Sequence, residues 1–260
     1  MLDDGLRRVL AIGDVHGEAD LLESMLAGFE ALDDPGEMRV PVIFLGDIVD
    51  RGGQSRQALD LVARTMAERP GSGLLLGNHD EWFLRFLRDE LTPEELQNWL
   101  EQGGAETLVS YGCRQFTRAG DMRDHVNAGW PNHRRLLEAA PTILLAERFA
   151  FVHAGVDPRR PIDAQLPQDC IWIRAPFMNH VGRLSHTIVH GHTPQKKGRP
   201  VVTENRISMD TGAVFTGKLS AVLIDLQTGD LAFHQVTPGS GLTAIGPVEL
   251  DRGLGTVLQP

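Results

Sequence analysis

Five short apolar segments of this chain each run into a loop that combines glycine with aspartate, asparagine or histidine. The five loops are Gly13-Asp14-Val15-His16-Gly17, Gly46-Asp47-Ile48-Val49-Asp50-Arg51-Gly52, Gly77-Asn78-His79-Asp80, Val152-His153-Ala154-Gly155 and His190-Gly191-His192-Thr193-Pro194. Because glycine lets the backbone turn sharply, each loop predicts a strand end that carries polar side chains. This repeated arrangement constrains the fold more than any other feature of the sequence.

Helical patterns follow the first three of these loops. Strands are predicted at residues 8–12, 40–45 and 74–76, and apolar residues recur at helical spacing after each loop. Strands that alternate with helices predict an α/β fold with parallel strands. In such folds ligands bind at the carboxyl ends of the strands, so we expect the loop residues to converge at one place.

The middle of the chain has a different pattern. Residues 91–140 carry helix signals without strands, beginning with the capping box Thr92-Pro93-Glu94-Glu95. We interpret this segment as a helical insertion lying over the site, with a packed part of the main core as the alternative. Strands are predicted again at 142–145, 149–152, 187–189, 206–209 and in a hairpin of 221–226 with 231–236. The expected organisation is a single domain over 1–240 and an irregular C-terminal extension over 241–260.

Composition and charge narrow the function classes. The 35 acidic side chains outnumber the 25 basic ones and give a net charge of −10, which disfavours attraction to nucleic acid and anionic membranes. No run of eighteen or more apolar residues is present, and residues 1–12 lack a secretory signal pattern. We therefore expect a cytoplasmic protein with no membrane association and no stable nucleic-acid complex. The sequence leaves the oligomeric state open.

The polar loop residues together indicate a metal site. Singly, each has an ordinary structural alternative: Asp14 could cap a helix, Asn78 could stabilise a turn, and His153 could be a buried core histidine. Gathered at one sheet edge, such groups would cost desolvation and charge repulsion unless a cation neutralised them. Mixed oxygen and nitrogen ligands suit manganese, iron or zinc better than calcium or magnesium.

The order of these motifs resembles that of a known family. Gly-Asp-x-His-Gly, Gly-Asp-x-x-Asp-Arg-Gly, Gly-Asn-His-Asp, His-Ala-Gly and Gly-His-Thr-Pro, over about residues 10–226, look like the calcineurin-like metallophosphoesterases. The sequence is most similar to their bacterial and phage branch, which includes bacteriophage lambda phosphatase, serine/threonine protein phosphatases and symmetrical diadenosine tetraphosphate hydrolases. The resemblance implies a four-layer sandwich of two mixed β-sheets flanked by helices, with a helical insertion and a dinuclear metal site at one edge.

Metal ligands are implied by the same resemblance. Asp14 and His16 would bind the first metal, Asp47 would bridge, and Asn78, His153 and His192 would bind the second. The cofactors implied are two divalent cations, with manganese favoured and iron or zinc as alternatives. Alignment on Gly-His-Thr-Pro makes His192 the ligand, so we interpret His190 as a structural histidine beside the site.

Catalytic roles follow from chemistry supported by the resemblance. Two neighbouring cations would lower the pKa of a shared water and clamp the phosphoryl oxygens for direct attack, without a covalent phosphoenzyme. Arg51 and Asn78 would contact the substrate phosphate, and His79 would protonate the leaving oxygen with Asp50 holding its imidazole. Arg174 resembles a second phosphate-binding arginine, with a structural role as an equal alternative.

These features predict a metal-dependent phosphoric ester hydrolase. The leading interpretation is a phosphatase like the serine/threonine protein phosphatases; the alternatives are a symmetrical dinucleoside polyphosphate hydrolase and a catalytically silent phosphoprotein-binding scaffold. The acidic balance makes a nuclease or cyclic phosphodiesterase the weakest candidate. Asp80 stands where protein phosphatases commonly have glutamate, which weakens the assignment to their substrate range. Four aromatic residues at helical spacing could stack a nucleotide base but are more typical of a core: Trp82, Phe83, Phe86 and Trp99.

Overall fold

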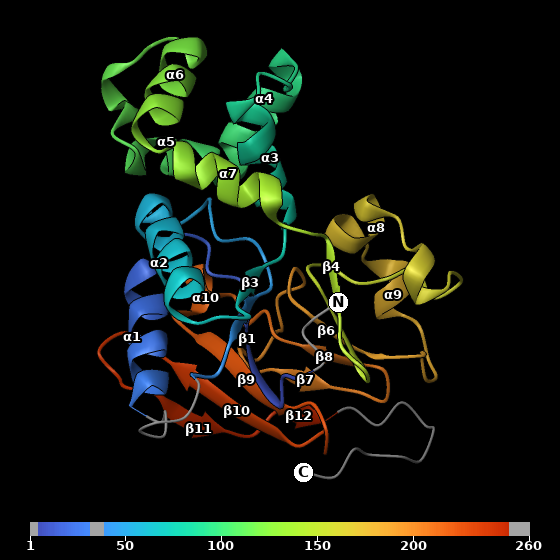
Figure 1. Cartoon of the computed structure of the whole chain (residues 1–260). Helices are drawn as coiled ribbons and strands as arrows, with labels where there is room; N and C mark the ends of the chain where they lie inside the picture. The colour runs from blue at the N-terminus through green and yellow to red at the C-terminus, as the bar shows by residue number, and fades with distance from the viewer. Residues whose placement is uncertain (1–4, 32–38, 250–260) are drawn as a thin grey trace.

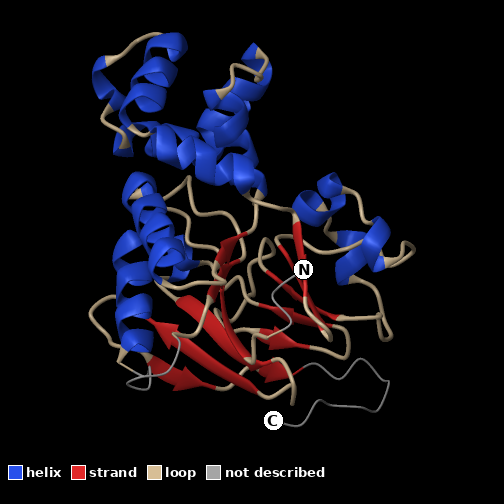
Figure 2. Cartoon of the chain, viewed as in Figure 1, coloured by secondary structure: helices blue, strands red, loops and turns tan. Residues whose placement is uncertain are grey.

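A computed structural model describes residues 5–31 and 39–249 of the chain. Two six-stranded sheets face each other, with helices on their outer sides and a helical lobe at one end (Figures 1 and 2). The strand orders are β11-β10-β9-β1-β2-β3 and β12-β7-β8-β6-β5-β4, and both sheets mix parallel with antiparallel pairs. This architecture confirms the predicted sandwich of two mixed sheets flanked by helices.

The elements have the following bounds. The strands are β1 (Arg8–Ile12), β2 (Val42–Phe44), β3 (Gly73–Leu74), β4 (Ile143–Leu145), β5 (Phe149–Val152), β6 (Thr187–His190), β7 (Val201–Val202), β8 (Arg206–Ser208), β9 (Leu219–Asp225), β10 (Leu231–Val236), β11 (Thr243–Ile245) and β12 (Val248–Glu249). The α-helices are α1 (Ala19–Glu30), α2 (Ser55–Glu68), α3 (Asn78–Leu87), α4 (Pro93–Trp99), α5 (Ala105–Ser110), α6 (Ala119–Gly129), α7 (Pro131–Ala139), α8 (Pro167–Trp172), α9 (Ala175–Met178) and α10 (Ala213–Thr216). A π-turn, η1 (Leu100–Gly104), joins α4 to α5, and two 3₁₀ turns are η2 (Cys113–Gln115) and η3 (Ile162–Ala164).

Strand β1 explains why the two sheets stack. Its side chains alternate between the faces of the sheet: Leu10 and Ile12 join the core under α1 and α2, whereas Val9 and Ala11 join the core between the sheets. Both sets are buried, so the strand is an uninterrupted apolar run. A strand that is apolar on both sides requires a layer on each side, which the helices and the second sheet supply.

The second sheet buries its outer face in the same way. Ala150 and Val152 of β5 and Ile188 of β6 pack against residues of α8 and α9, among them Ile171 and Phe177. These helices therefore form the fourth layer, on the side of the sandwich away from α1 and α2 (Figure 1).

The segment between β3 and β4 folds as helices, as predicted. Its second helix, α4, has the predicted capping box: Thr92 Oγ1 accepts a hydrogen bond from Glu95 N at 3.2 Å, and Glu95 Oε2 accepts one from Thr92 N at 2.8 Å. Trp99, Leu108 and Tyr111 continue the core that contains α1 and α2. The lobe is therefore packed onto the main domain. Among the described residues, no helix has the length and apolarity that crossing a membrane requires.

The irregular extension predicted for residues 241–260 is wrong over part of its length. β11 pairs antiparallel with β10, and β12 pairs parallel with β7. These strands have two or three residues each, so they carry no periodic pattern of their own and are defined by the edges that they join. Residues 250–260 lie outside the described part. The third helix also begins three residues earlier than predicted, at Asn78 rather than Glu81.

Candidate metal centre

The carboxyl ends of two pairs of parallel strands, one pair in each sheet, bring the polar loops together. Asp14 follows β1, Asp47 follows β2, His153 follows β5 and His192 follows β6, while Asn78 begins α3 just after β3. All five are buried, with at most 5% of their surface exposed. Residues up to 178 positions apart thus contact one another: the His192 backbone N–H donates to both carboxylate oxygens of Asp14, at 3.0 and 3.1 Å.

The Asp47 carboxylate lies at the centre of the cluster. Its Oδ2 atom is 3.3 Å from His153 Nε2 and 3.5 Å from His16 Nε2. Its Oδ1 atom accepts a hydrogen bond from the His79 backbone N–H at 2.9 Å. The Asn78 side-chain oxygen lies 2.9 Å from His153 Nε2 and 2.8 Å from His192 Nδ1. All six residues predicted as ligands therefore lie in one cluster.

Two sets of possible metal ligands share Asp47. One set is His16, Asp47 and His79, and the other is Asp47, His153 and His192; within each, the donor atoms lie within 4.8 Å of one another. A carboxylate shared between two nitrogen-rich groups is the donor arrangement that a pair of divalent transition-metal ions requires.

The orientation of the imidazoles leaves nitrogen lone pairs directed at Asp47. His16 Nδ1 is 2.9 Å from the carbonyl oxygen of Val49, and His153 Nδ1 is 2.8 Å from that of Leu45. Because a carbonyl only accepts, each Nδ1 carries the proton and donates it. Nε2 of each ring is then the nitrogen that can bind a cation, and the carbonyls fix the rings as partners of metal-binding histidines commonly do.

Charge in the cluster is strongly perturbed by burial. Burial raises the pKa of Asp14 well above its ordinary value, and repulsion from Asp210 adds to the effect. Burial lowers the pKa of His16 to about 3. Burial also opposes a proton on His153, but the Asp47 carboxylate outweighs it and raises the pKa of His153 to about 10. Positive charge next to Asp47 is therefore strongly favoured, and a metal ion can supply it in place of a proton.

The backbone around the cluster is strained. Among the described residues, five of the six non-glycine positions with positive φ lie in these loops: His16, Asp47, Asp50, Arg51 and His192, with φ between 46° and 72°. Left-handed conformations of such residues are unfavourable and persist where the surrounding structure enforces them, typically at functional sites.

His79 lies between Asp50 and Arg51. His79 Nδ1 is 2.7 Å from Asp50 Oδ2, and its Nε2 accepts a hydrogen bond from Arg51 Nη2 at 2.8 Å. The other guanidinium nitrogen of Arg51 contacts His16 Nε2. On the far side of the cluster, Arg174 Nε donates to His192 Nε2 at 3.0 Å. The four residues predicted to act on substrate thus border the ligand cluster.

The helical lobe supplies a set of contacts that the sequence analysis missed. The Asp50 carboxylate accepts hydrogen bonds from Trp99 Nε1 at 2.9 Å and from Thr107 Oγ1 at 2.7 Å, and the Asp50 N–H donates to Thr107 Oγ1 at 2.9 Å. Trp99 had been considered only as a core or base-stacking residue. No local motif marks Thr107, so its role becomes visible only in three dimensions.

The π-turn η1 of the lobe contacts Arg51, the residue after Asp50. The Gly103 carbonyl accepts a hydrogen bond from the Arg51 N–H at 3.2 Å. Gly103 has a φ of 113°, and a Cβ atom there would lie 2.3 Å from Arg51 N. Only glycine fits this close approach. The pair Gly103-Gly104 is the available signal in the sequence, because adjacent glycines interrupt a helix.

Two further carboxylates complete the surroundings. Asp80 accepts hydrogen bonds from the backbone N–H groups of Ile48, Val49 and Gly77, so it ties the Asp47 loop to the start of α3. Burial raises the pKa of Asp80 to about 7, with repulsion from Asp47 as the second cause. Asp210 is buried as well, and burial raises its pKa to about 6. Such crowding of acids favours bound cations.

Several predicted or notable residues lie beside the cluster rather than in it. His190 Nε2 is 2.7 Å from Ser208 Oγ and its Nδ1 is 2.9 Å from the Gly191 carbonyl oxygen, so both of its nitrogens have protein partners. Of the four aromatic residues considered for base stacking, Phe83, Phe86 and Trp99 are buried core residues. Trp82 is half-buried and its ring centroid is 5.4 Å from that of His79.

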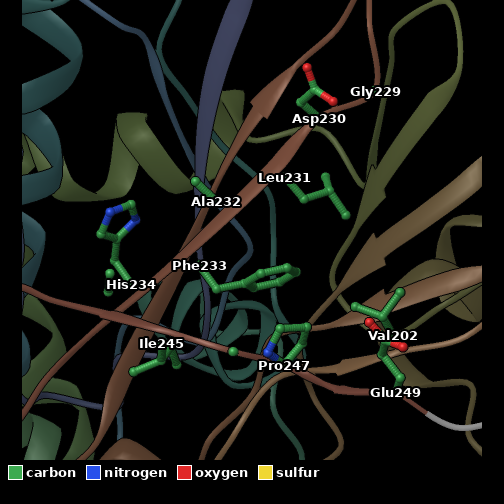
Figure 3. A pocket seen from close by; sticks show the side chains of 12 residues that line it. Val202, Gly229, Asp230, Leu231, Ala232, Phe233, His234, Ile245, Pro247 and Glu249 are labelled. Atoms are coloured by element: carbon green, nitrogen blue, oxygen red, sulfur yellow. The ribbon is translucent and has the colours of Figure 1, made fainter. Parts of the chain in front are cut away.

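A separate apolar pocket lies at the opposite end of the sandwich. Its walls include Leu231 and Phe233 of β10, Ile245 of β11 and Val202 of β7 (Figure 3). Leu231 is paired with Ile224, which is in turn paired with Val9 near the start of β1, whereas the polar loops follow the end of that strand. None of the predicted site residues lines this pocket.

Comparison with known proteins gives the same classification as the geometry. The chain is 27% identical over 234 residues to the bis(5'-nucleosyl)-tetraphosphatase PrpE (asymmetrical) of Anoxybacillus flavithermus, covering 81% of this chain and 88% of that protein. A protein provisionally described as a diadenosine tetraphosphatase has a similar structure, with a TM-score of 0.60 at 21% identity over 92% of this chain and 97% of that one. A protein-tyrosine phosphatase from a psychrophilic Shewanella species shares the fold with a TM-score of 0.58 at 16% identity, over 95% of this chain and 83% of that one. The model of the calcineurin-like phosphoesterase family matches residues 7–217, and the chain belongs to that family.

Proposed function

We propose that this protein is a phosphoesterase that binds two divalent cations and hydrolyses its substrate by direct attack of water on phosphorus. The observation that carries the proposal is the position of the Asp47 carboxylate, which lies between His16 and His79 on one side and His153 and His192 on the other. The two cations, when bound, lower the pKa of water and neutralise charge on the phosphoryl oxygens.

The chain's own residues would hold the cations in the manner implied by the family. Asp14 and His16 would bind the first, Asp47 would bridge, and Asn78, His153 and His192 would bind the second. The donor set of imidazole nitrogens with carboxylate and amide oxygens suits manganese, with iron or zinc as alternatives.

Arg51, Arg174 and His79 act on the substrate. The planar guanidinium of Arg51 now donates to two imidazoles, and a phosphate oxygen is a stronger acceptor for the same donors. His79 Nδ1 donates to Asp50, and once Arg51 donates to the phosphate instead, Nε2 would take up a second proton from solvent and pass it to the leaving oxygen. Arg174, which donates to His192, would bind the phosphoryl group from the other side, and Asn78, which also contacts His192, would contact the phosphate as well.

The favoured substrate class is dinucleoside polyphosphates. The relative with 27% identity carries the name of a bis(5'-nucleosyl)-tetraphosphatase, and so do the relatives from Oceanobacillus iheyensis and Bacillus velezensis. This support from sequence outweighs the similarity to protein phosphatases, which extends to the fold alone. A phosphoprotein substrate is the second candidate.

The test of the chemistry is release of phosphate from p-nitrophenyl phosphate by metal-free protein to which one cation at a time is returned. Manganese is expected to stimulate turnover, and Asp47→Asn should abolish it because the substitution removes the bridging charge. The exposed residue Asp163 offers a matched control, since Asp163→Asn deletes a surface carboxylate outside the cluster. Failure of manganese, iron, zinc and cobalt to support turnover would favour the non-catalytic scaffold instead.

The substrate class is tested with the same preparation. Diadenosine tetraphosphate, a panel of phosphopeptides, mononucleotides and cyclic nucleotides are compared by kcat/KM. The highest value is expected for diadenosine tetraphosphate. A clear preference for phosphopeptides would contradict the nucleotide assignment while leaving the dinuclear chemistry intact.

A further inference from the structure

All three lysines of the chain lie beside the metal cluster. The sequence contains 25 basic residues, yet lysine occurs only at positions 196, 197 and 218. Lys196 and Lys197 are exposed on the loop that follows His192, and Lys218 follows α10. These segments touch, because a Cβ atom at Gly198 would lie 3.2 Å from Lys218 Cδ. We call Lys196, Lys197 and Lys218 the basic rim.

The basic rim is tied to the residues of the cluster. The His192 N–H donates to Asp14, and the Gln195 N–H donates to the Asp210 carbonyl oxygen at 2.9 Å. Lys196 is four positions after His192, so their Cα atoms are at most about 14 Å apart. The ammonium groups can therefore reach phosphates that adjoin the one under attack.

An exposed aromatic ring on α10, three residues before Lys218, lies beside Arg51. Phe215 of α10 is 70% exposed, the highest value among the large apolar side chains described. Its ring centroid is 5.7 Å from Arg51 Cζ. The turn that presents it is held firmly: Gly212 and Gly217 at its two ends are left-handed, and Thr216 Oγ1 donates to the Thr211 carbonyl oxygen at 2.8 Å.

Charge and shape together identify the ligand chemistry. On a protein with a net charge of −10, a cluster of three ammonium groups is a local reversal of sign that selects an anionic ligand. Among the described residues, none of the three forms an ion pair with a carboxylate, so their charges are available. An open aromatic face beside them suits the flat ring of a base, since stacking on aromatic side chains is tolerant of base identity.

We propose that the basic rim and Phe215 form a subsite for the distal part of a nucleoside polyphosphate. The lysines contact the phosphates that are not attacked, and Phe215 stacks against the base. The subsite rests on the proposed function, because it places the attacked phosphorus at the Asp47 cluster beside Arg51. It explains a preference for nucleotides over phosphoproteins without requiring a deep base pocket.

Selectivity between a large and a small substrate tests the subsite. The ratio of kcat/KM for diadenosine tetraphosphate to kcat/KM for p-nitrophenyl phosphate is measured for the full chain in manganese. In the triple variant Lys196→Gln, Lys197→Gln, Lys218→Gln, this ratio is expected to fall by about tenfold or more, and the salt dependence of KM for the dinucleotide should weaken. Arg183→Gln is the matched control, because Arg183 is an exposed cation on the loop before the start of β6. A ratio equal to that of the wild type in the triple variant would overturn the proposal.

The aromatic half of the subsite has its own variants. Phe215→Ala should raise KM for diadenosine tetraphosphate about tenfold and leave the KM for inorganic tripolyphosphate, which has no base, much less affected. Phe215→Trp should restore dinucleotide binding, and Val181→Ala controls for loss of an exposed apolar side chain. Equal losses on both substrates would show that Phe215 acts only through Arg51 and would refute stacking.

Binding measured without turnover separates the two proposals. Fluorescence anisotropy of a labelled ATP analogue reports occupancy of the subsite whether or not the protein hydrolyses it. Binding that is lost in the triple variant supports the subsite even if the wild type releases no phosphate, a result that would refute only the proposed hydrolysis. If the triple variant keeps nucleotide binding but loses affinity for an acidic phosphopeptide, the subsite belongs to a peptide and the nucleotide assignment is wrong.

Discussion

At the scale of single residues, the site is organised around two carboxylates with different surroundings. The Asp47 carboxylate lies near Nε2 of both His16 and His153, and this position suits a ligand that bridges two cations. Asp50, three residues later, is fully used by protein partners: His79, Trp99 and Thr107. The different hydrogen-bond partners of Asp47 and Asp50 therefore suit the first to a bridging role and the second to orienting His79.

The role of His79 is tested by substitution with asparagine. His79→Asn should leave metal content unchanged and lower kcat by about 100-fold or more on substrates with poor leaving groups, because loss of a general acid is felt most there. Metal analysis and a series of aryl and alkyl phosphates provide the measurement. A loss that is equal across leaving groups would count against proton donation. A loss of metal would instead identify His79 as a ligand, since its side chain also lies near His16 and Asp47.

The sequence could predict which loop residues lie together, but not the backbone conformation that brings Arg51 into contact with His16 and His79. Glycine-flanked motifs after strands indicate convergence because parallel strands end at one edge. The contact of Arg51 with both His16 and His79 depends on left-handed backbone at Asp50 and Arg51. No sequence pattern requires non-glycine residues to adopt that conformation, so this geometry was not predictable.

At the scale of elements, the helical lobe supports the loop that carries Asp50 and Arg51. The first turn of α5 provides Thr107, the end of α4 provides Trp99, and the π-turn provides the Gly103 carbonyl. These groups fix Asp50 and the Arg51 backbone in place. Insertion of one residue in the π-turn would rotate Thr107 relative to Trp99 around the helix axis. π-turns of this kind often occur at functional sites.

Replacement of Thr107 tests this support. Thr107→Val keeps the shape of the side chain but removes the hydroxyl that donates to the buried Asp50 Oδ1, at a cost of about 1–3 kcal/mol, while the Asp50 N–H keeps Ser55 Oγ as an acceptor. We expect kcat to fall with metal content preserved, and the loss to be greatest for poor leaving groups, because His79 is oriented through Asp50. Thr107→Ser should restore the rate. If serine fails to rescue, or if all substrates are slowed equally, Thr107 contributes to packing alone.

A second link joins the lobe to the main domain and makes stability depend on pH. His133 of α7 has Nδ1 2.7 Å from the Tyr111 hydroxyl and Nε2 3.0 Å from Asp60 Oδ1 of α2, and the charge of Arg56 of α2 disfavours a proton on the ring. Burial lowers the pKa of His133, and the Asp60 carboxylate opposes this only in part. The unfolded chain therefore binds the proton more readily, and the contribution of His133 to stability declines as the pH falls below its ordinary pKa of about 6.5.

Denaturant unfolding between pH 7 and pH 5 measures this effect. His133→Gln should be less stable than the wild type at pH 7 but should lose less stability on acidification. The comparison uses the slope of unfolding free energy against pH, because the loss of hydrogen bonds in the variant lowers its stability at every pH and leaves the slope unchanged. A variant slope as steep as that of the wild type would mean that other groups cause the acid sensitivity.

Prediction of elements succeeded where burial imposes a pattern. The bounds of β1 and β5 coincide with the predicted 8–12 and 149–152, because both strands are continuous apolar runs bounded by polar residues. β7, β11 and β12 were not predicted, because each takes its strand conformation from the edge that it pairs with. The capping box at Thr92 was predictable because it is entirely local.

At the scale of the whole molecule, the polar and charged residues of the site lie together at one end of the sandwich. Apolar layers occupy the space between and outside the sheets, and the polar loops are confined to the strand ends under the lobe. The chain is acidic overall, but its lysines gather at this same end. Only a short loop thus separates the proposed cation-binding centre from the proposed anion-binding rim.

Anomalous diffraction from crystals grown with manganese tests the proposed centre most directly. Two manganese peaks are predicted, one on each side of the Asp47 carboxylate, with Asp14 and His16 at the first and Asn78, His153 and His192 at the second. A single peak, or peaks away from Asp47, would contradict a dinuclear centre and with it the proposed hydrolysis.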